Sequence, residues 1–476
     1  YTQVFEEDKY EGKEEFPLAK PYKRDTNLTS LLNLKVEKPH IKIIIVEGLG
    51  KKFVDSKNGY ADLMPALNKL MSTALYWPNY LSNTGEGAAA MPLIIGSLPY
   101  GETGFTQLES FTHRHTLFSI MKDNGYETSF NFGGNSALHS YDKFLVQEGV
   151  DRILDKTIFG KAYSLQDEDA AGISLGYPDM ALFQRYQEEQ MATSNAPKLD
   201  VFLTLSTKNP YAIPNEETYI KNVENYLAGS SLNDKSKRLI EHNLKLFASY
   251  SYVDNAIDLF FEEEKKSKEY NNTIYLITGS HLNRNLPSEN PLERFQVPLI
   301  IYSPLVKEAK ILDEMVSHAD IAPSLVSLLD NTYSLQVPNT VAWLGDNAIF
   351  TQDKKNIKEI PLYRGAHNIQ DYIYNNYFLT DGDVTKLNSD LSWSESEVSE
   401  KNIDLILRKF KYSKSVNKYV TQQDKLIPAS ASLISNSKRV FTKTEMIWLQ
   451  SVFNGKDFDN AYGTARKLAF KKDWDR

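Results

Sequence analysis

The side chains that could do chemistry in this chain begin with Glu47. An apolar run from residue 40 to residue 46 stops at this carboxylate, and Gly48-Leu-Gly50 follows it. The run is typical of a buried strand in a parallel sheet, and ligands of such sheets bind outside the carboxyl ends of the strands. Glu47 is therefore a candidate ligand for a divalent metal.

Glu47 lacks the companions that a metal-dependent reaction needs. Two further segments with glycines at strand or helix ends, residues 84–91 and 277–281, read TGEGAAAM and ITGSH. Neither supplies a nucleophile or a second carboxylate where one would be expected. The sequence thus predicts an enzyme scaffold from which most catalytic groups are missing.

Composition limits the classes of protein that the chain can belong to. It has 476 residues, a net charge of −8 and no cysteine, with 41% hydrophobic and 24% charged residues. These values exclude disorder throughout, disulfides and thiolate chemistry, and they argue against nucleic acid as a partner. The chain is long enough for one large core plus an appendage, because cores rarely grow beyond about 300 residues.

The first 39 residues are charged and weakly patterned, so we expect an N-terminal linker there. The chain lacks a signal peptide and any apolar run of about 18 residues, so we expect the chain as given to be soluble. Release from an anchored or secreted precursor stays open.

Strand and helix patterns alternate between residues 40 and 350. This alternation predicts a mainly parallel sheet covered on both faces by helices. The predicted strands are 40–46, 75–81, 126–132, 199–206, 273–278 and 297–302, and the predicted helices are 61–74, 111–124, 237–268 and 320–329.

The pattern changes near residue 351. Shorter strands, including residues 374–380, and the turn at residues 381–383 predict a small C-terminal α+β subdomain with an antiparallel sheet over residues 351–441. Residues 389–400 are expected to form a loop. Residues 442–476 predict a helical tail, which is either the start of a tetratricopeptide-like array or a helix docked on the domain.

Five segments occur in an order that resembles the alkaline phosphatase and sulfatase superfamily. The closest resemblance is to the extracellular domains of the lipoteichoic acid synthase-like branch, and it covers residues 38–387. The segments are residues 43–47, 83–85 before 96–101, 132–135, 277–281 and 317–324.

The resemblance implies a phosphate- or sulfate-transfer site with one or two divalent metals and a threonine, serine or formylglycine nucleophile. In the synthase-like branch the metal, usually manganese, is held by the first-strand acid, the threonine and an Asp-His pair. Glu47 matches the acid, but Gly87 stands at the nucleophile position. Ser280 and His281 match the Asp-His pair, so one metal carboxylate is also lost, and Glu47 and His281 are residual ligands at best.

The resemblance also implies a lipid headgroup pocket, whose matching stretches are residues 136–141 and 206–211. These stretches place His139, Tyr141 and Lys208 near the site as weak candidates for substrate binding. Lys208 could attract an anion, although the family pocket itself is not reproduced.

Structural roles compete with each chemical role. Glu47 is as good a candidate for capping the backbone of the next turn as for residual metal binding. A hydrogen-bonded crevice histidine is favoured for His281, and a place near the cap of the helix containing Asp320 is favoured for His318. Thr84 and Ser82 could replace the nucleophile only if their loop shifted register.

These arguments predict a catalytically degenerate sulfatase-like domain that serves as an envelope binding or scaffold module. The alternative is an active metal-dependent phosphoryl, phosphoglycerol or sulfuryl transferase or hydrolase with a remodelled nucleophile. A third hypothesis is that the alanine and glycine loop was engineered. We expect no cofactor for the degenerate domain, and Mn²⁺, Mg²⁺ or Zn²⁺ if the alternative of an active enzyme holds. The expected partners are an envelope glycan, a lipid headgroup or a protein, in a periplasmic or cell-surface location with a membrane tether outside this chain.

Overall fold

A computed structural model describes residues 12–25, 28, 31–54, 60–99, 114–169, 171–189, 195–351, 358–365, 369–428 and 431. The helical tail predicted for residues 442–476 lies outside this part of the chain, as do residues 1–11, 26–27 and 29–30 of the predicted linker. Residues 111–113 of one predicted helix also lie outside it.

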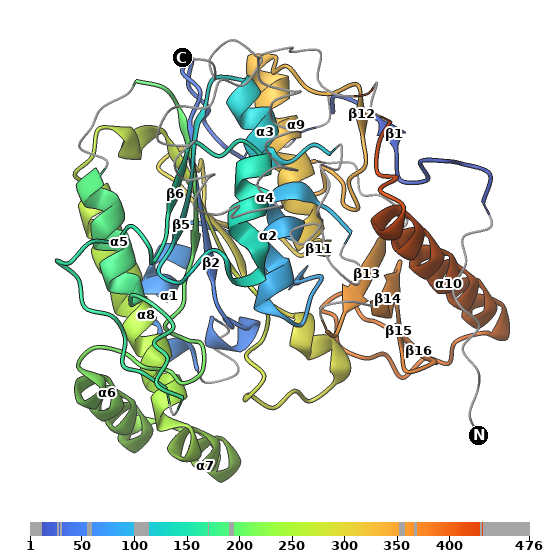
Figure 1. The fold of residues 1–476 in the computed structure, drawn as a ribbon. Helices are drawn as coiled ribbons and strands as arrows, with labels where there is room; N and C mark the ends of the chain where they lie inside the picture. The colour runs from blue at the N-terminus through green and yellow to red at the C-terminus, as the bar shows by residue number, and fades with distance from the viewer. Residues whose placement is uncertain are drawn as a thin grey trace.

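An eight-stranded sheet forms the centre of the described fold, in the order β10-β3-β9-β8-β2-β7-β5-β6. All neighbouring pairs in it are parallel except those of β9, which is antiparallel to both β3 and β8. The predicted mainly parallel sheet is therefore confirmed (Figure 1). The strands are β2 (His40–Val46), β3 (Leu75–Trp77), β5 (Glu127–Phe132), β6 (Arg152–Leu154), β7 (Lys198–Leu203), β8 (Thr273–Gly279), β9 (Leu299–Tyr302) and β10 (Lys310–Ile311).

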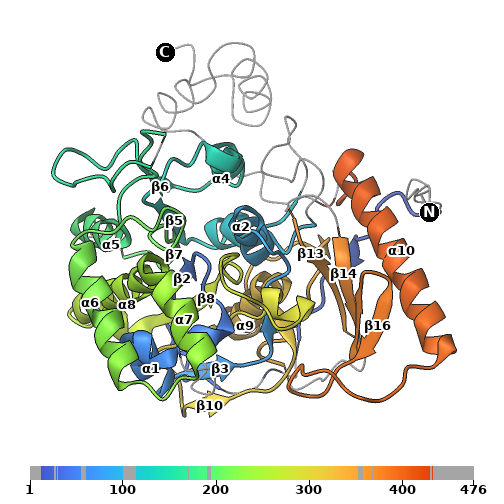
Figure 2. The same cartoon turned by 90° about the horizontal axis from the view of Figure 1, so that it is seen from below.

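Two layers of helices cover this sheet, as the alternation of side chains along β2 requires. Ile41, Ile43 and Ile45 pack in one core with α2, α3, α4 and α9. Ile44 and Val46 pack in a second core with α1, α5 and α8 (Figure 2). The helices are α1 (Pro65–Met71), α2 (Gly87–Gly96), α3 (Leu117–Asp123), α4 (Tyr141–Gln147), α5 (Asp179–Glu189), α6 (Glu216–Gly229), α7 (Asp234–His242), α8 (Leu244–Glu264) and α9 (Ile321–Tyr333).

The predicted elements that the structure divides include a helix and a strand of the main unit. The helix predicted for residues 237–268 breaks at Asn243, whose side chain donates a hydrogen bond to the carbonyl of Leu239 at the end of α7. This local bond competes with continuation of the helix. The strand predicted for residues 75–81 turns after β3, and its second part, β4 (Tyr80–Leu81), pairs with β11 (Val316–Ser317) outside the large sheet.

A four-stranded antiparallel sheet, β13 (Glu359–Tyr363), β14 (Ile369–Tyr374), β15 (Tyr377–Thr380) and β16 (Asp383–Lys386), follows the main unit. Asp381 and Gly382 between β15 and β16 have φ of 49° and 93°, as the predicted hairpin turn requires. Helix α10 (Glu400–Gln422), which was not predicted from the sequence, packs on this sheet. Two backbone bonds through Tyr363, to Asn83 and Gly85, join the small sheet to the loop before α2.

Candidate functional site

The centre of the candidate site is the edge of the sheet where three adjacent parallel strands end. Glu47 follows β2, Thr204 follows β7 and Ser280 follows β8. The strand registers align these ends, because Ile45 pairs with Leu203 and Val46 pairs with Gly279. Side chains that are far apart in the sequence therefore meet at one crevice.

A cleft of about 360 Å³ opens at this edge. Six of the seven site residues predicted from the sequence line it, and the seventh, Ser280, is fully buried beneath it. The lining residues are Glu47, Glu86, Gly87, Ala88, Phe132, His139, Tyr141, Leu203, Thr204, Leu205, Thr207, Lys208, Asn209, Tyr211, His281, Asn283, Arg284 and Asn285.

The carboxylate of Glu47 lies directly over Gly87. A Cβ atom placed on Gly87 would lie 2.3 Å from Glu47 Oε2 and 2.7 Å from Oε1, closer than real carbon–oxygen contacts allow. Gly87 is the first residue of α2, where unpaired backbone N–H groups carry partial positive charge that favours a carboxylate. Glu47 thus occupies the space that a side chain at position 87 would need.

Ser280 connects Glu47 to His281. Its Oγ donates to Glu47 Oε2 at 2.9 Å, accepts from the backbone N–H of Gly48 at 3.0 Å and lies 2.9 Å from His281 Nδ1. A hydroxyl has one hydrogen, which Glu47 takes, so the proton between Ser280 and His281 belongs to Nδ1. This assignment leaves Nε2 of His281 as the unprotonated nitrogen.

Burial favours the neutral form of the His281 ring. Burial lowers its pKa, and the nearby Glu47 carboxylate raises it by less. His281 is 7% exposed, and in its neutral form Nε2 can accept a hydrogen bond from a ligand in the cleft.

The donor set does not fit a resident divalent cation. Among the residues that the structure describes, no group of three or more His, Cys, Asp or Glu side chains could hold a metal ion. Glu47 and His281 are the two potential ligands at the cleft floor, and Ser280 contributes a neutral hydroxyl that is already bonded to both. Hard cations such as Mg²⁺ and Mn²⁺ need more oxygen ligands than this.

The hydroxyl groups around Gly87 are engaged in backbone hydrogen bonds. Thr84 Oγ1 accepts from the N–H of Glu86 at 3.1 Å, and Ser82 Oγ donates to the carbonyl of Ser280 at 2.8 Å. Both residues are fully buried and lie outside the cleft lining. At the cleft wall, Thr207 Oγ1 donates to the carbonyl of Glu47 at 2.5 Å. These bonds give the hydroxyls structural roles.

The three weak substrate-binding candidates have different environments. Tyr141 is buried, and its hydroxyl donates to the carbonyl of Ala88 at 2.8 Å, which fixes the start of α2. His139 has an exposed side chain at the cleft, and partial desolvation and the charge of Lys208 lower its pKa. Lys208 is exposed, and its side chain makes no hydrogen bond or ion pair with another described residue. It is the candidate best placed to receive an anion.

His318 lies away from the cleft lining and is completely buried. Its Nε2 is 2.9 Å from the carbonyl of Gly279, and burial lowers its pKa to about 3. Ser317 caps the turn of residues 318–320, and Asp320 completes a capping box. The predicted position of His318 near this helix cap is confirmed.

Several residues that shape the cleft were not found from the sequence. Thr204 accepts the N–H of Glu47 at 2.9 Å, and its position after a predicted strand was an available signal. Asp179 accepts the N–H groups of Leu205 and Ser206 at 2.7 and 3.0 Å, and burial raises its pKa to about 6. Arg284 forms an ion pair with Glu86 at the rim. Nothing in the sequence marks the last two.

The amino-acid sequence is similar to those of a known family and of several characterised proteins. A family model described as Sulfatase matches residues 39–331. The chain is 22% identical over 402 residues to lipoteichoic acid synthase 2 of Bacillus subtilis, which covers 80% of this chain and 57% of that protein. It is 22% identical over 266 residues to lipoteichoic acid synthase of Staphylococcus aureus, covering 54% of this chain and 38% of that protein. The chain spans about half the length of these curated relatives.

Solved structures show the same fold. A protein of the alkaline phosphatase superfamily from Vibrio parahaemolyticus aligns with a TM-score of 0.64 and 18% identity, over 88% of this chain and 93% of that chain. The lipoteichoic acid synthase LtaP of Listeria monocytogenes aligns with a TM-score of 0.63 and 16% identity, over 86% of this chain and 97% of that chain. The alkaline phosphatase-like fold expected from the sequence is confirmed.

Proposed function

This chain belongs to the sulfatase family, and we propose that it is a catalytically inactive member that serves as a binding or scaffold module in the cell envelope. Its ligand is an envelope glycan, a lipid headgroup or a protein that enters the cleft between Glu47 and Lys208. Its relatives are named as synthases, and the proposal is that this chain lacks such an activity.

One observation carries the proposal, namely the carboxylate of Glu47 in the space above Gly87. Transfer through a covalent intermediate requires a nucleophilic side chain that points into the cleft. Gly87 has none, and Glu47 now fills the volume in which a nucleophile at this position would lie. An anion approaching the start of α2 would also meet this carboxylate and be repelled.

Ser280 supports the same conclusion. Its hydroxyl holds Glu47 in place by a neutral hydrogen bond, whereas a carboxylate at this position would repel Glu47 unless a cation lay between them. With Gly87 and Ser280 at these positions, no second carboxylate faces Glu47, so no metal ion is needed to offset repulsion between carboxylates. Removing both a nucleophile and a metal carboxylate should cost more than the 10²- to 10⁴-fold typical of one acid–base group.

Ser280, Glu47 and His281 contact one another and superficially resemble a catalytic triad. A nucleophilic serine must present its Oγ to the substrate. Ser280 is 0% exposed, and its Oγ already bonds Glu47, His281 and the backbone of Gly48. This cluster supports a structural role and disfavours the alternative of an enzyme with a remodelled nucleophile.

The location and tether also belong to the proposal. We place the domain outside the cytoplasm, at the cell surface or in the periplasm, with a membrane tether supplied by sequence outside this chain. Within the described residues, every helix is too short or too polar to cross a bilayer.

The test is to incubate the purified chain with aryl phosphates, aryl sulfates and a phosphatidylglycerol analogue, with and without Mn²⁺. We expect turnover at background, equal for the wild type and Glu47→Ala, and no stoichiometric metal by elemental analysis. An active lipoteichoic acid synthase domain is the positive control. Metal-dependent turnover that Glu47→Ala abolishes would overturn the proposal in favour of the enzyme.

Binding needs its own measurement. Glycerol phosphate, inorganic phosphate and inorganic sulfate are suitable probes for the anion-binding side of the cleft, monitored by calorimetry or by the chemical shifts of the residues around Lys208. Lys208→Ala should weaken any binding that is seen, whereas Arg284→Ala serves as a comparison, because Arg284 is already paired with Glu86.

A further inference from the structure

Helix α10 carries a concentration of positive charge that the cleft does not explain. Residues 405–422 contain five basic and no acidic side chains, in a chain whose net charge is −8. A basic segment on an acidic protein attracts anionic partners locally, although the whole molecule does not. This helix is therefore a candidate interaction surface.

Two of the cations on α10 contact other side chains of the domain. Lys409 pairs with Glu359 of β13 at 3.0 Å, and Lys414 lies 5.4 Å from the centre of the Phe410 ring. Arg408, Lys411 and Lys418 form no ion pair with any residue that the structure describes. Three positive charges thus remain unneutralised.

Large apolar side chains accompany these charges on the same face. Leu407 is 38% exposed and Tyr412 is 52% exposed. Leu407 and Lys411 are an i, i+4 pair, and so are Arg408 and Tyr412, so the four side chains form two adjacent rows along the exposed half of the helix. Ile406, Val416 and Val420 on the opposite side are buried. We call Leu407, Arg408, Lys411, Tyr412 and Lys418 the α10 face. Asp404 is the acidic residue at its N-terminal end.

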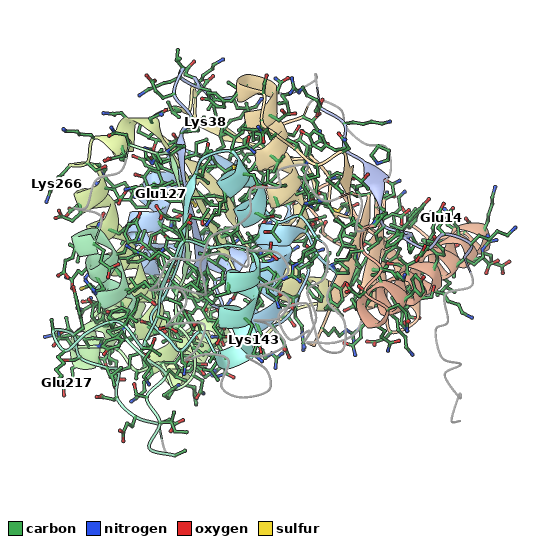
Figure 3. The ribbon with its side chains drawn as sticks, turned by 45° about the horizontal axis from the view of Figure 1, so that its top comes forward. Glu14, Lys38, Glu127, Lys143, Glu217 and Lys266 are labelled. Atoms are coloured by element: carbon green, nitrogen blue, oxygen red, sulfur yellow. The ribbon has the colours of Figure 1, made fainter. Side chains whose placement is uncertain are left out.

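The α10 face lies on the outer flank of the molecule. Figure 2 shows α10 on the far side of the small sheet from the central sheet. The N-terminal segment runs along the same flank, where Tyr419 donates to the carbonyl of Glu15 at 3.2 Å, and Figure 3 shows Glu14 beside this helix. Tyr412 borders a groove that it shares with Pro17, Leu18 and Ala19 of this segment, yet Leu407 and Tyr412 both remain exposed.

We propose that the α10 face docks the domain on a bilayer that contains anionic lipids. Arg and Lys side chains near an anionic leaflet are attracted to it, and leucine and tyrosine bury apolar surface at the headgroup boundary. Binding of a soluble polyanion would explain the exposed cations but not the exposed apolar surface of Leu407 and Tyr412. The combination favours a membrane surface, and the inference is independent of the chemistry of the cleft.

The test is sedimentation of the whole chain with vesicles. We expect binding to phosphatidylcholine vesicles with about three parts in ten phosphatidylglycerol, none to pure phosphatidylcholine, and release by salt. The triple variant Arg408→Gln, Lys411→Gln, Lys418→Gln should lose binding about 10- to 100-fold. The double variant Leu407→Ser, Tyr412→Ser should lose binding to vesicles but keep binding to soluble polyphosphate.

Helix α7 supplies a matched control. Lys235→Gln, Lys237→Gln, Arg238→Gln removes the same charge from another surface helix and should leave vesicle binding unchanged. Thermal unfolding confirms that every variant folds. No binding to anionic vesicles, or an equal loss in the α7 control, overturns the proposal. Unchanged vesicle binding by the Leu407 and Tyr412 variant also overturns it, because the surface would then recognise polyanions in general.

Discussion

Glu47 Oε2 would lie 2.3 Å from a Cβ atom on Gly87, so these two positions cannot both carry an ordinary side chain in the present geometry. Glu47 comes from the end of β2, and Gly87 begins α2. The Glu47 carboxylate can therefore take this position only because residue 87 is a glycine.

A first prediction tests this coupling. Gly87→Ala should destabilise the wild type by about 1 kcal/mol, because the new methyl group moves the flexible Glu47 carboxylate off its hydrogen bond to Ser280. In a Glu47→Ala background the same change should be neutral or stabilise by up to about 1 kcal/mol, because alanine favours the helix more than glycine does. Urea unfolding of the four proteins measures the coupling energy, and additive effects of the two changes would contradict the structural interpretation.

A second prediction concerns metal affinity. Ser280→Asp should place a second carboxylate beside Glu47 and lower the melting temperature at neutral pH through repulsion. Millimolar Mn²⁺ should raise the melting temperature of this variant by binding the folded state. Ser280→Asn, which has the same size and no charge, is the control. An equal response of the wild type or of Ser280→Asn to Mn²⁺ would show that the wild-type site already binds the ion.

A third prediction uses the buried carboxyl of Asp179. Burial raises its pKa to about 6, so the folded state binds this proton more tightly than the unfolded chain does. Its contribution to stability is fully present below about pH 4 and is lost as the pH rises through about 6. Relative to Asp179→Asn, which does not titrate, the wild type should lose up to about 3 kcal/mol between these limits. Urea unfolding across this range measures the difference, which would stay constant if Asp179 were ionised throughout.

A fourth prediction concerns the ion pair beneath the sheet. Lys42 of β2 contacts Glu264 of α8 at 2.5 Å, and both side chains are more than nine-tenths buried. Lys42→Met should destabilise the protein by about 3–5 kcal/mol, because it leaves Glu264 as an unpaired buried charge. The double change Lys42→Met, Glu264→Gln should recover part of that loss in urea unfolding. A single variant as stable as the wild type would show that water reaches this carboxylate.

Local sequence patterns were sufficient for much of the fold. The apolar run before Glu47 predicted β2, and the alternation of strand and helix patterns predicted the covered parallel sheet. The same patterns did not show the break between α7 and α8, because the amide of Asn243 ends the first helix by one specific hydrogen bond. They also did not locate α10, whose buried side depends on contacts with the distant strands β14 and β15.

For the site, the sequence by itself determined which groups are present: a carboxylate at Glu47, no side chain at Gly87, a hydroxyl at Ser280 and an imidazole at His281. Only the tertiary structure decided what these groups do to one another. The Ser280 hydroxyl bonds both Glu47 and His281, and the Glu47 carboxylate fills the space above Gly87. The reason is physical, since hydrogen bonds and steric contacts depend on distances across three separate segments, and those distances exist only once β2, β8 and α2 have packed together.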